Sequence, residues 1–291
     1  MNFVLFLAVL MFLESDAIKL LKLANPIDLT WSFTSNSFYT KNTHPFLLTK
    51  QTSRLSEDGT WYAQNEFCTG EHVGTHFNAP YHRNRQGYKV HEIPLKHLIA
   101  HGIKVDLRLQ TKRLKNKSVL LPQHLEKWVR THGPIQQYTV LLVQFHWSQY
   151  YNNKTLYLGA KNDYELSFPG ISKSAAEWIV KTKKIVGVGV DTAAVDKGIY
   201  NSEISKKILL DNNVYVLENL NIPAKFPDDN FALYVLPMKI FDGTGAPLRI
   251  IAVPEENVTK GVIIAVVPWY THVVVLTISC LWFYVQVFLR N

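Results

Sequence analysis

Runs of apolar residues and runs of alternating polarity divide this chain into many short strands and few helices. Thr139–Phe145 and Ile185–Val190 are mostly apolar, as expected of strands buried on both faces of a sheet. Ile103–Leu109 alternates apolar and polar residues, which predicts a half-exposed strand. Further strands are predicted at Ala24–Thr30, Leu55–Phe67, Val214–Leu217, Phe231–Leu236 and Arg249–Val253.

The clearest helix is predicted over Ser172–Lys183. Ala175, Ala176 and Ile179 recur at helical spacing, and Ser172 is suited to cap the first turn. Pro122–Arg130 is a second predicted helix, and Lys206–Leu210 ends a third, short one. Strands that alternate with a few helices predict one mixed α/β domain from Pro26 to Val253.

The two ends of the chain differ from this domain. Phe3–Leu13 is apolar and is followed by the small residues Ser15 and Ala17, which predicts a secretory signal peptide over residues 1–17. Residues 261–289 contain no Asp, Glu, Lys or Arg, and about 20 apolar residues suffice to cross a bilayer. We therefore expect a C-terminal apolar helix that tethers the domain to a membrane, with a cleaved lipid-anchor signal as the alternative.

Composition and charge limit the kinds of partner that the chain is expected to bind. The chain is 47% hydrophobic and 19% charged, which describes a folded protein. Its net charge of +8 is dispersed, without a basic stripe, so nucleic acid is not an expected partner. Glycosylation acceptor triplets begin at Asn116, Asn153 and Asn257, in keeping with an extracellular or lumenal domain. Cys280 lies in the predicted tail, so Cys68 has no disulfide partner in the domain.

The strongest chemical signal is a cluster of histidines. His72, His76 and His82 fall within eleven residues, together with the carboxamide of Asn78. A turn that leads into a short extended segment would aim His72, His76 and Asn78 in one direction. Imidazoles this close together commonly bind a divalent metal, and the alternative is a solvated histidine-rich loop.

The stretch from His72 through Gly74, Thr75, His76 and Pro80 to His82 resembles the signature of the cyclase family of metal-dependent hydrolases. That family includes bacterial kynurenine formamidases and isatin hydrolases. Further matching segments follow in the same order, namely Trp147-Ser148, Phe168–Gly170, Gly189–Thr192, Leu217–Leu220 and Gly245–Arg249. The resemblance implies a swivelling β/β/α fold with a mixed sheet, a homodimer, and hydrolysis of a small aromatic amide or lactam.

The resemblance also implies the roles of the site residues. His72, His76 and position 78 would hold one divalent metal, zinc or manganese, and His82 and Glu218 would help to hold a second. The family has a bridging aspartate at position 78 and an acid/base histidine at position 206, where this chain has Asn78 and Lys206. Asp191 and Asp196 are interpreted as turn-forming residues.

Each of the two substitutions makes the net charge of the site one unit more positive. A carboxamide is a weaker ligand than a carboxylate, and a lysine stays protonated to about pH 10. Two divalent cations ~3.5 Å apart repel by roughly 19 kcal/mol at an effective dielectric of 20. We therefore predict at most one metal, with Lys206 paired to Glu218. Three hypotheses follow. The protein is an impaired mononuclear amide hydrolase, or it is a catalytically inactive, membrane-tethered ligand-binding or interaction protein. The third is a structural membrane protein without a pocket.

Overall fold

The structure is a computed structural model that describes residues 25–39, 43–159, 166–198 and 203–254, all within one compact unit that ends at Pro254. The predicted signal peptide (1–17), the predicted tail helix (261–289) and the triplet at Asn257 lie outside the described residues. Within the described ranges, no helix has the length and apolarity needed to span a bilayer.

The strands are β1 (Ile27–Asp28), β2 (Leu47–Leu55), β3 (Trp61–Cys68), β4 (His76–Asn78), β5 (Ile99–Asp106), β6 (Val119–Leu120), β7 (Thr139–Gln144), β8 (Gly170–Ile171), β9 (Ile185–Val190), β10 (Tyr215–Glu218), β11 (Phe231–Pro237) and β12 (Gly245–Pro254). The α-helices are α2 (Leu95–Leu98), α3 (Arg108–Leu114), α4 (Pro122–His132), α5 (Lys154–Leu158), α6 (Lys173–Thr182) and α7 (Ile204–Asp211). Short 3-10 helices include η1 (Pro80–His82), η3 (Lys115–Lys117) and η4 (Trp147–Tyr150).

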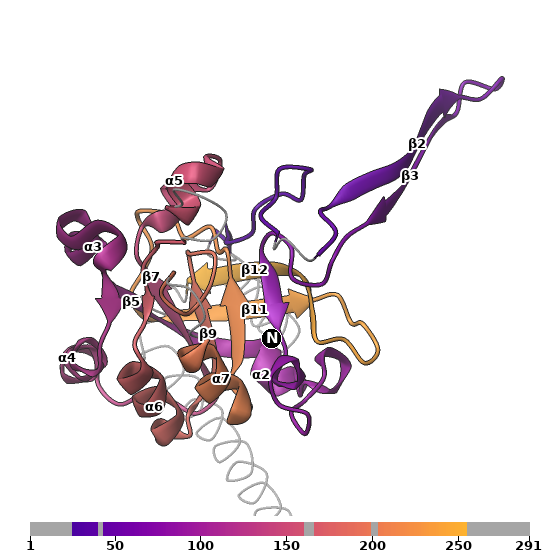
Figure 1. Cartoon of the computed structure of the whole chain (residues 1–291). Helices are drawn as coiled ribbons and strands as arrows, with labels where there is room; N and C mark the ends of the chain where they lie inside the picture. The colour runs from indigo at the N-terminus through magenta and orange to yellow at the C-terminus, as the bar shows by residue number, and fades with distance from the viewer. Residues whose placement is uncertain (1–24, 40–42, 160–165, 199–202, 255–291) are drawn as a thin grey trace, which may run out of the picture. The chain divides into compact units, whose positions relative to one another are not determined.

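Eight strands form a mixed sheet in the order β1-β12-β11-β5-β7-β9-β10-β4. The strands β5, β7, β9 and β10 are parallel to one another, and the other pairs are antiparallel. Strand β4 also pairs with β12, so the sheet closes on itself like a barrel. Figure 1 shows α4, α6 and α7 gathered on one side of this sheet.

Two hydrophobic clusters pack on opposite faces of the central strands. Leu141 and Val143 of β7 belong to the cluster that includes Leu125 of α4, Ile179 of α6 and Leu209 of α7. The intervening residues of β7, together with apolar residues of β11 and β12, belong to a second cluster inside the closed sheet. This alternation explains why the β7 segment is apolar throughout: both of its faces are buried.

The main elements predicted from the sequence are confirmed. The apolar runs form β7 and β9, and the amphipathic segment forms α6, with the Ser172 hydroxyl accepting the Ala175 N–H at 3.1 Å. In β9, a Cβ on Gly187 would lie 2.2 Å from the Tyr215 ring, so glycine permits the close approach of β10.

Two strand predictions are wrong in part. The Leu55–Phe67 segment is not one strand, because β2 ends at Leu55 and β3 begins at Trp61 after a turn. The Ile103–Leu109 segment is a strand only as far as Asp106, where β5 ends, and Leu109 lies in α3. Ile103, Lys104 and Val105 are buried, because β5 lies between β11 and β7. The Lys104 side chain is 1% exposed, and its ammonium donates to Gln144 Oε1 at 3.0 Å and contacts Asp228 at 3.1 Å. A buried lysine with these partners can occupy an interior strand.

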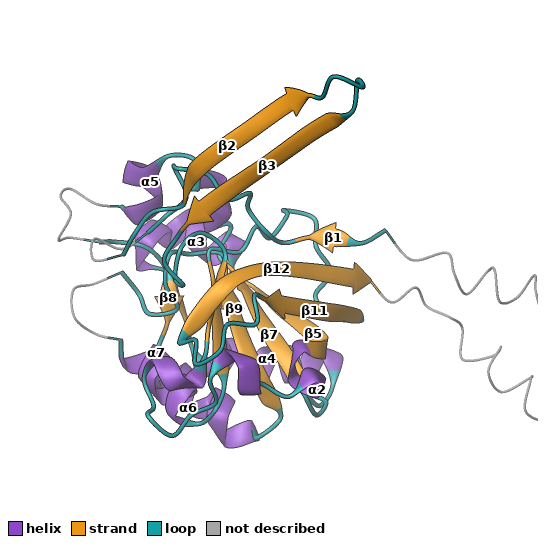
Figure 2. Cartoon of the chain, turned by 90° about the vertical axis from the view of Figure 1, so that its right-hand side faces the viewer, coloured by secondary structure: helices purple, strands orange, loops and turns teal. Residues whose placement is uncertain are grey.

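Strands β2 and β3 form a separate two-stranded hairpin that extends away from the closed sheet (Figures 1 and 2). Nearly all of its residues are exposed, including the large apolar side chains of Leu55, Trp61 and Phe67.

Candidate active site

The short strand β4 places His76 and Asn78 on one face. Side chains alternate along a strand, so His76 and Asn78 point away from Phe77, which is buried inside the closed sheet. Strand β4 pairs with β10 so that His76 lies opposite Glu218. Glu218 shares its face with Val216, which packs in the cluster beneath the helices. The pairing of these two strands therefore brings His76, Asn78 and Glu218 together.

A tight turn before β4 fixes the His76 ring. Gly74 has φ +58°, and its carbonyl oxygen accepts a hydrogen bond from His76 Nδ1 at 3.0 Å and from Asn219 Nδ2 at 2.8 Å. Asn219 also has a positive φ of 59°, and its carbonyl oxygen accepts from the Thr75 hydroxyl at 2.8 Å. Because Nδ1–H is donated to a carbonyl, the other ring nitrogen, Nε2, is directed at the Glu218 carboxylate.

Glu218 is a buried carboxylate with a partner on each side. Lys206 Nζ lies 2.9 Å from Oε1 and 3.1 Å from Oε2. The Val195 N–H donates to Oε1 at 2.8 Å, Asn78 Nδ2 donates to Oε2 at 3.1 Å, and His76 Nε2 lies 3.2 Å from Oε2. The predicted pair between Lys206 and Glu218 is present in the structure.

Asp196 places Lys206 in this position. Its two carboxylate oxygens accept the backbone N–H groups of Ser205 at 2.7 Å and Lys206 at 2.9 Å, in the first turn of α7. These bonds satisfy amides that have no partner within the helix. This geometry agrees with the structural role predicted for Asp196. Asp191 also binds backbone amides, since it accepts the N–H groups of Phe145 and Trp147 at 2.9 Å each.

The charges around Glu218 keep it ionised. Burial alone would raise the pKa of Glu218, but the Lys206 ammonium and the His76 hydrogen bond outweigh burial and hold that pKa well below its usual range. The negative charge of Glu218 is therefore already matched by the positive charge of Lys206, as expected of a buried ion pair.

His72 is held by a second chain of hydrogen bonds. Its Nε2 lies 3.0 Å from the Thr244 hydroxyl, which in turn donates to the Glu71 carboxylate. The Thr244 oxygen therefore accepts from His72 Nε2–H, and the lone pair of His72 lies at Nδ1. Gly245 makes room for this ring, because a Cβ there would lie 2.7 Å from His72 Nδ1.

His72 and His82 are neutral imidazoles. Their ring centroids are 4.2 Å apart, and His72 lies 5.4 Å from His76. Burial, with His76 as the next cause, lowers the pKa of His72 to about 2. Burial, with the neighbouring Arg83 as the next cause, lowers the pKa of His82 to about 3. Neutral imidazole is the form that binds a metal or accepts a hydrogen bond.

All six residues singled out from the sequence line one cavity of about 380 Å³: His72, His76, Asn78, His82, Lys206 and Glu218. Phe38, Leu166 and Phe168 supply an apolar wall, and Arg83 and Glu203 form an ion pair among the other lining residues. This volume lies in the range of small-molecule sites, which is roughly 300–1,000 Å³. The alternative of a solvated histidine loop is therefore wrong.

Three residues that support the site were missed from the sequence. Glu71 and Thr244 orient His72, and Asn219 joins the turn at Gly74 to strand β10. Glu71 and Thr244 stand 173 positions apart, so nothing in the local pattern links them. Asn219 had a usable signal, because asparagine is one of the few residues that readily adopts a positive φ.

The donor atoms at this site fit one cation. His72 Nδ1 and Asn78 Oδ1 are buried acceptors without a hydrogen-bond partner among the described residues, and His76 Nε2 lies at the same cavity, 3.2 Å from Glu218 Oε2. The Asn78 amide is oriented by donation to Glu218 and to the Val216 carbonyl, which fixes Oδ1 as the free end. Histidines whose other N–H is bound to an oxygen acceptor are typical metal ligands.

The same atoms do not fit a second cation. In the ranges that the structure describes, no three His, Cys, Asp or Glu side chains form a metal-binding group. The candidate ligands that remain at this cavity are two imidazoles and one carboxamide. The anion that would stabilise another metal, Glu218, is already paired with Lys206 at 2.9 Å. Two neighbouring divalent ions need anionic bridging, which these residues do not supply.

This closed mixed sheet, with its histidine-lined cavity at the carboxyl end of β10, defines an α/β domain with a candidate small-molecule site. The chain belongs to the family described as "Putative cyclase", whose model matches residues 27–197, more than half of the chain.

Its relatives in that family are hydrolases by name. Isatin hydrolase from Roseibium aggregatum is 28% identical over 223 residues, which cover 74% of this chain and 83% of that one. Kynurenine formamidase from Paracidovorax citrulli is 25% identical over 189 residues, which cover 61% and 74%. The structure of isatin hydrolase A from Ralstonia solanacearum superposes with a TM-score of 0.73 at 25% identity and covers 85% of this chain and 97% of that one.

Proposed function

We propose that this protein is a hydrolase of amide C–N bonds in small aromatic amides or lactams, and that it works with a single divalent cation at a reduced rate. One observation carries the proposal: two buried acceptor atoms without partners among the described residues, His72 Nδ1 and Asn78 Oδ1, occur at the cavity that His76 also lines. Buried polar atoms are rarely left unpaired unless a ligand completes them.

The cavity wall favours a flat apolar substrate. Phe38, Leu166 and Phe168 face the same space as the histidines, so an aromatic ring can contact them while its amide carbonyl reaches the polar end. The relatives named isatin hydrolase and kynurenine formamidase support this substrate class, since isatin is an aromatic lactam.

The polar end contains the groups that the chemistry needs, although two of them are weak. A bound zinc or manganese ion, held by His72, His76 and Asn78, would polarise the amide carbonyl and lower the pKa of a water molecule. Lys206 donates to Glu218 and has a third N–H left to stabilise the developing oxyanion. His82 is a poor proton acceptor, because its pKa of about 3 lies far from neutrality.

A binding protein without catalysis is the second candidate, and the Lys206–Glu218 pair favours it. The ammonium pairs with the Glu218 carboxylate and adds positive charge near the unpaired atoms of His72 and Asn78, which weakens their affinity for a divalent ion. The apolar wall would then retain an aromatic ligand without hydrolysing it.

Kinetics with and without metal separate the two candidates. The protein is stripped with a chelator, reloaded with zinc or manganese, and assayed with isatin and an aryl formamide. We expect slow turnover that needs metal, that is lost in His72→Ala, and that persists in His132→Ala, an exposed histidine on α4. Binding without turnover under every metal condition would contradict the hydrolase and support the binding protein.

The hairpin supports a proposal about the partner. We infer that the protein forms a homodimer in which β2 and β3 contact the second copy, because an isolated two-stranded hairpin is only marginally stable in water. Trp61 and Phe67 are 62% and 52% exposed on it, as expected of side chains that anchor an interface. We also propose that the domain is extracellular or lumenal and membrane-tethered, on the basis of the residue patterns at 1–17 and 261–289.

A further inference from the structure

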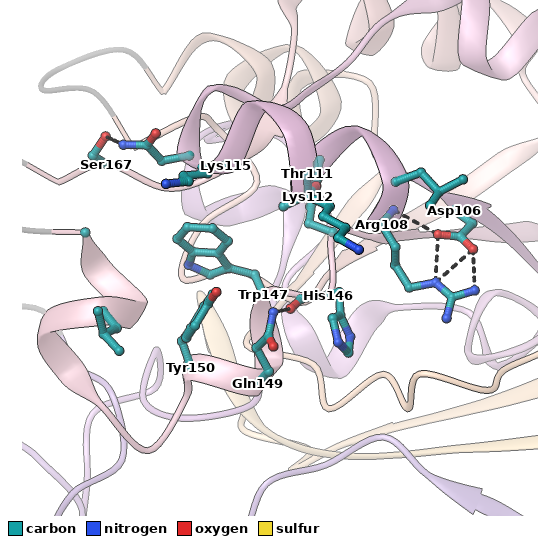
Figure 3. Close-up of a pocket in the computed structure, with 15 residues that line it drawn as sticks. Asp106, Arg108, Thr111, Lys112, Lys115, His146, Trp147, Gln149, Tyr150 and Ser167 are labelled. Atoms are coloured by element: carbon teal, nitrogen blue, oxygen red, sulfur yellow. Dashed lines mark hydrogen bonds and ion pairs between the residues drawn. The ribbon is translucent and has the colours of Figure 1, made fainter.

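A second cavity of about 950 Å³ lies at α3 and η4 and shares no lining residue with the histidine cavity. It is lined from three directions, by α3 and η3, by η4, and by α5 with residues that follow it (Figure 3). Its volume reaches the upper end of the range for small-molecule sites, roughly 300–1,000 Å³. We refer to it as the basic cavity.

One wall of the basic cavity carries positive charge that the described residues do not neutralise. Arg108 is paired with Asp106, at 3.0 Å between Nε and Oδ1 and 2.7 Å between Nη2 and Oδ2. Lys112 and Lys115 form no ion pair within the described part of the chain. Lysines in the last turn of a helix can simply complement its dipole, so this wall alone does not define a site.

The opposite wall is aromatic and rigid. The Trp147 indole donates Nε1–H to the Tyr157 carbonyl at 2.7 Å, and its ring packs edge-on against Tyr150 with centroids 5.1 Å apart. In Figure 3 these two rings lie across the cavity from the α3 helix that carries Lys112. A flat apolar ring placed between these walls would contact aromatic surface on one side and ammonium groups on the other.

The backbone is strained at two points of the same lining. Lys115 has φ 53° and ψ −128°, and His146 has φ 61° and ψ 28°. Non-glycine residues in these regions carry backbone strain and concentrate at ligand sites. His146 Nδ1 is also buried without a hydrogen-bond partner among the described residues. Neither feature is explained by the dipole of α3.

We propose that the basic cavity binds a small aromatic anion, such as an aryl carboxylate. Its ring packs on Trp147 and Tyr150, and its negative charge lies between the ammonium groups of Lys112 and Lys115. The site is independent of the hydrolase chemistry, because none of its residues reaches the histidine cavity.

Calorimetric titration with 2-naphthoate tests this assignment, with neutral 2-naphthamide as the isosteric comparison. Lys112→Gln combined with Lys115→Gln removes two exposed charges that make no ion pair in the described chain. We expect the Kd for 2-naphthoate to rise about tenfold in this double variant, as follows from losing charged hydrogen bonds at a partly exposed site. Leu156→Trp, at a lining residue that is 53% exposed, should fill the cavity and weaken binding further.

The matched control is Lys127→Gln combined with Lys181→Gln, which removes the same charge from exposed positions on α4 and α6 outside both cavities. Its Kd should stay within about twofold of the wild type, since distant exposed charges are screened by salt. Equal Kd values for 2-naphthoate in the two double variants would overturn the proposal. So would equally tight binding of 2-naphthamide, because the lysines would then contribute nothing.

Discussion

The histidine cavity and the β2–β3 hairpin depart from ordinary burial in opposite directions. In the cavity a carboxylate and an ammonium are buried, with Glu218 2% and Lys206 6% exposed, whereas on the hairpin Trp61 is 62% exposed. Polar groups are costly to bury and large apolar groups are costly to expose in quantity. In the cavity the ion pair between Lys206 and Glu218 offsets the cost of burial. On the hairpin the proposed second copy of the chain would offset the cost of exposure.

The largest effect is expected at the buried pair. Glu218→Gln leaves the Lys206 ammonium without its anion, and breaking a buried pair in this way costs about 3–5 kcal/mol of unfolding free energy. Lys206→Met costs less, since Glu218 keeps donors from Val195 and Asn78. Urea denaturation of both single variants and the double variant measures the coupling.

The matched control for this cycle lies on the same helix. Lys207 and Asp211 form an exposed pair at 2.7 Å on α7, and removing it should cost about 0.5 kcal/mol or less. Additive losses at Glu218 and Lys206, with no recovery in the double variant, would show that the cavity does not neutralise its own charges.

The second largest effect is expected on dimerisation, from substitutions in the hairpin. Trp61→Ser and Phe67→Ser should each weaken association by about 2 kcal/mol or more, which raises the dimer Kd about thirtyfold. Sedimentation velocity of the domain measures this equilibrium. Phe241→Ser is the control, because Phe241 is 78% exposed but lies outside the hairpin. A wild-type domain that is monomeric at high concentration would contradict the proposed partner.

The pH dependence of stability follows from His72 and His82. Their folded pKa values of about 2 and about 3 lie below the unfolded value, so between pH 6.5 and 3 the unfolded chain binds more protons and stability falls as the pH falls. From pH 7.5 to 5 each histidine should cost about 2 kcal/mol. His82→Gln should lose its share of this dependence in urea denaturation, and His132→Gln should not. An unchanged pH slope in His82→Gln would disprove the assignment.

The smallest energetic effect is expected at the glycosylation triplets. Asn153 Oδ1 caps α5 by accepting the Leu156 N–H at 3.0 Å, which leaves Nδ2 exposed, whereas Asn116 Nδ2 donates to Ser167 at 2.6 Å. Expression through a secretory pathway should therefore modify Asn153 before Asn116. Thr155→Ala removes the Asn153 triplet and leaves the cap of α5 intact. The intact mass should fall by one glycan, and the free energy of unfolding should fall by less than about 0.5 kcal/mol. Modification of Asn116 alone would contradict this order.

The sequence predicted the cavity well because its main residues are close together or lie in recognisable strands. The histidine cluster forms a turn and a short strand, and the segment before Glu218 forms β10, as expected. The charge argument at Asn78 and Lys206 also predicted the ion pair, because it depended on residue types and not on distant geometry.

The parts of the fold that the sequence did not predict depend on contacts between distant segments, which local sequence patterns do not show. The exposure of a strand is decided by its neighbours, and β5 looked half-exposed because Lys104 is polar, although its partner Gln144 lies 40 positions away. The turn at 56–60 that divides β2 from β3 was missed, because the predicted strand was based on Trp61 and Tyr62 and was extended back to Leu55 through the turn. The basic cavity joins α3 to η4, and neither segment suggests the other.

Metal stoichiometry tests the central claim most directly. Elemental analysis of the purified domain, after equilibration with zinc or manganese and removal of free metal, counts the ions bound per chain. With Lys206 in the position of a cation, the wild type should hold no more than one ion, and Asn78→Asp combined with Lys206→His should gain one. Two tightly bound ions in the wild type would contradict the account.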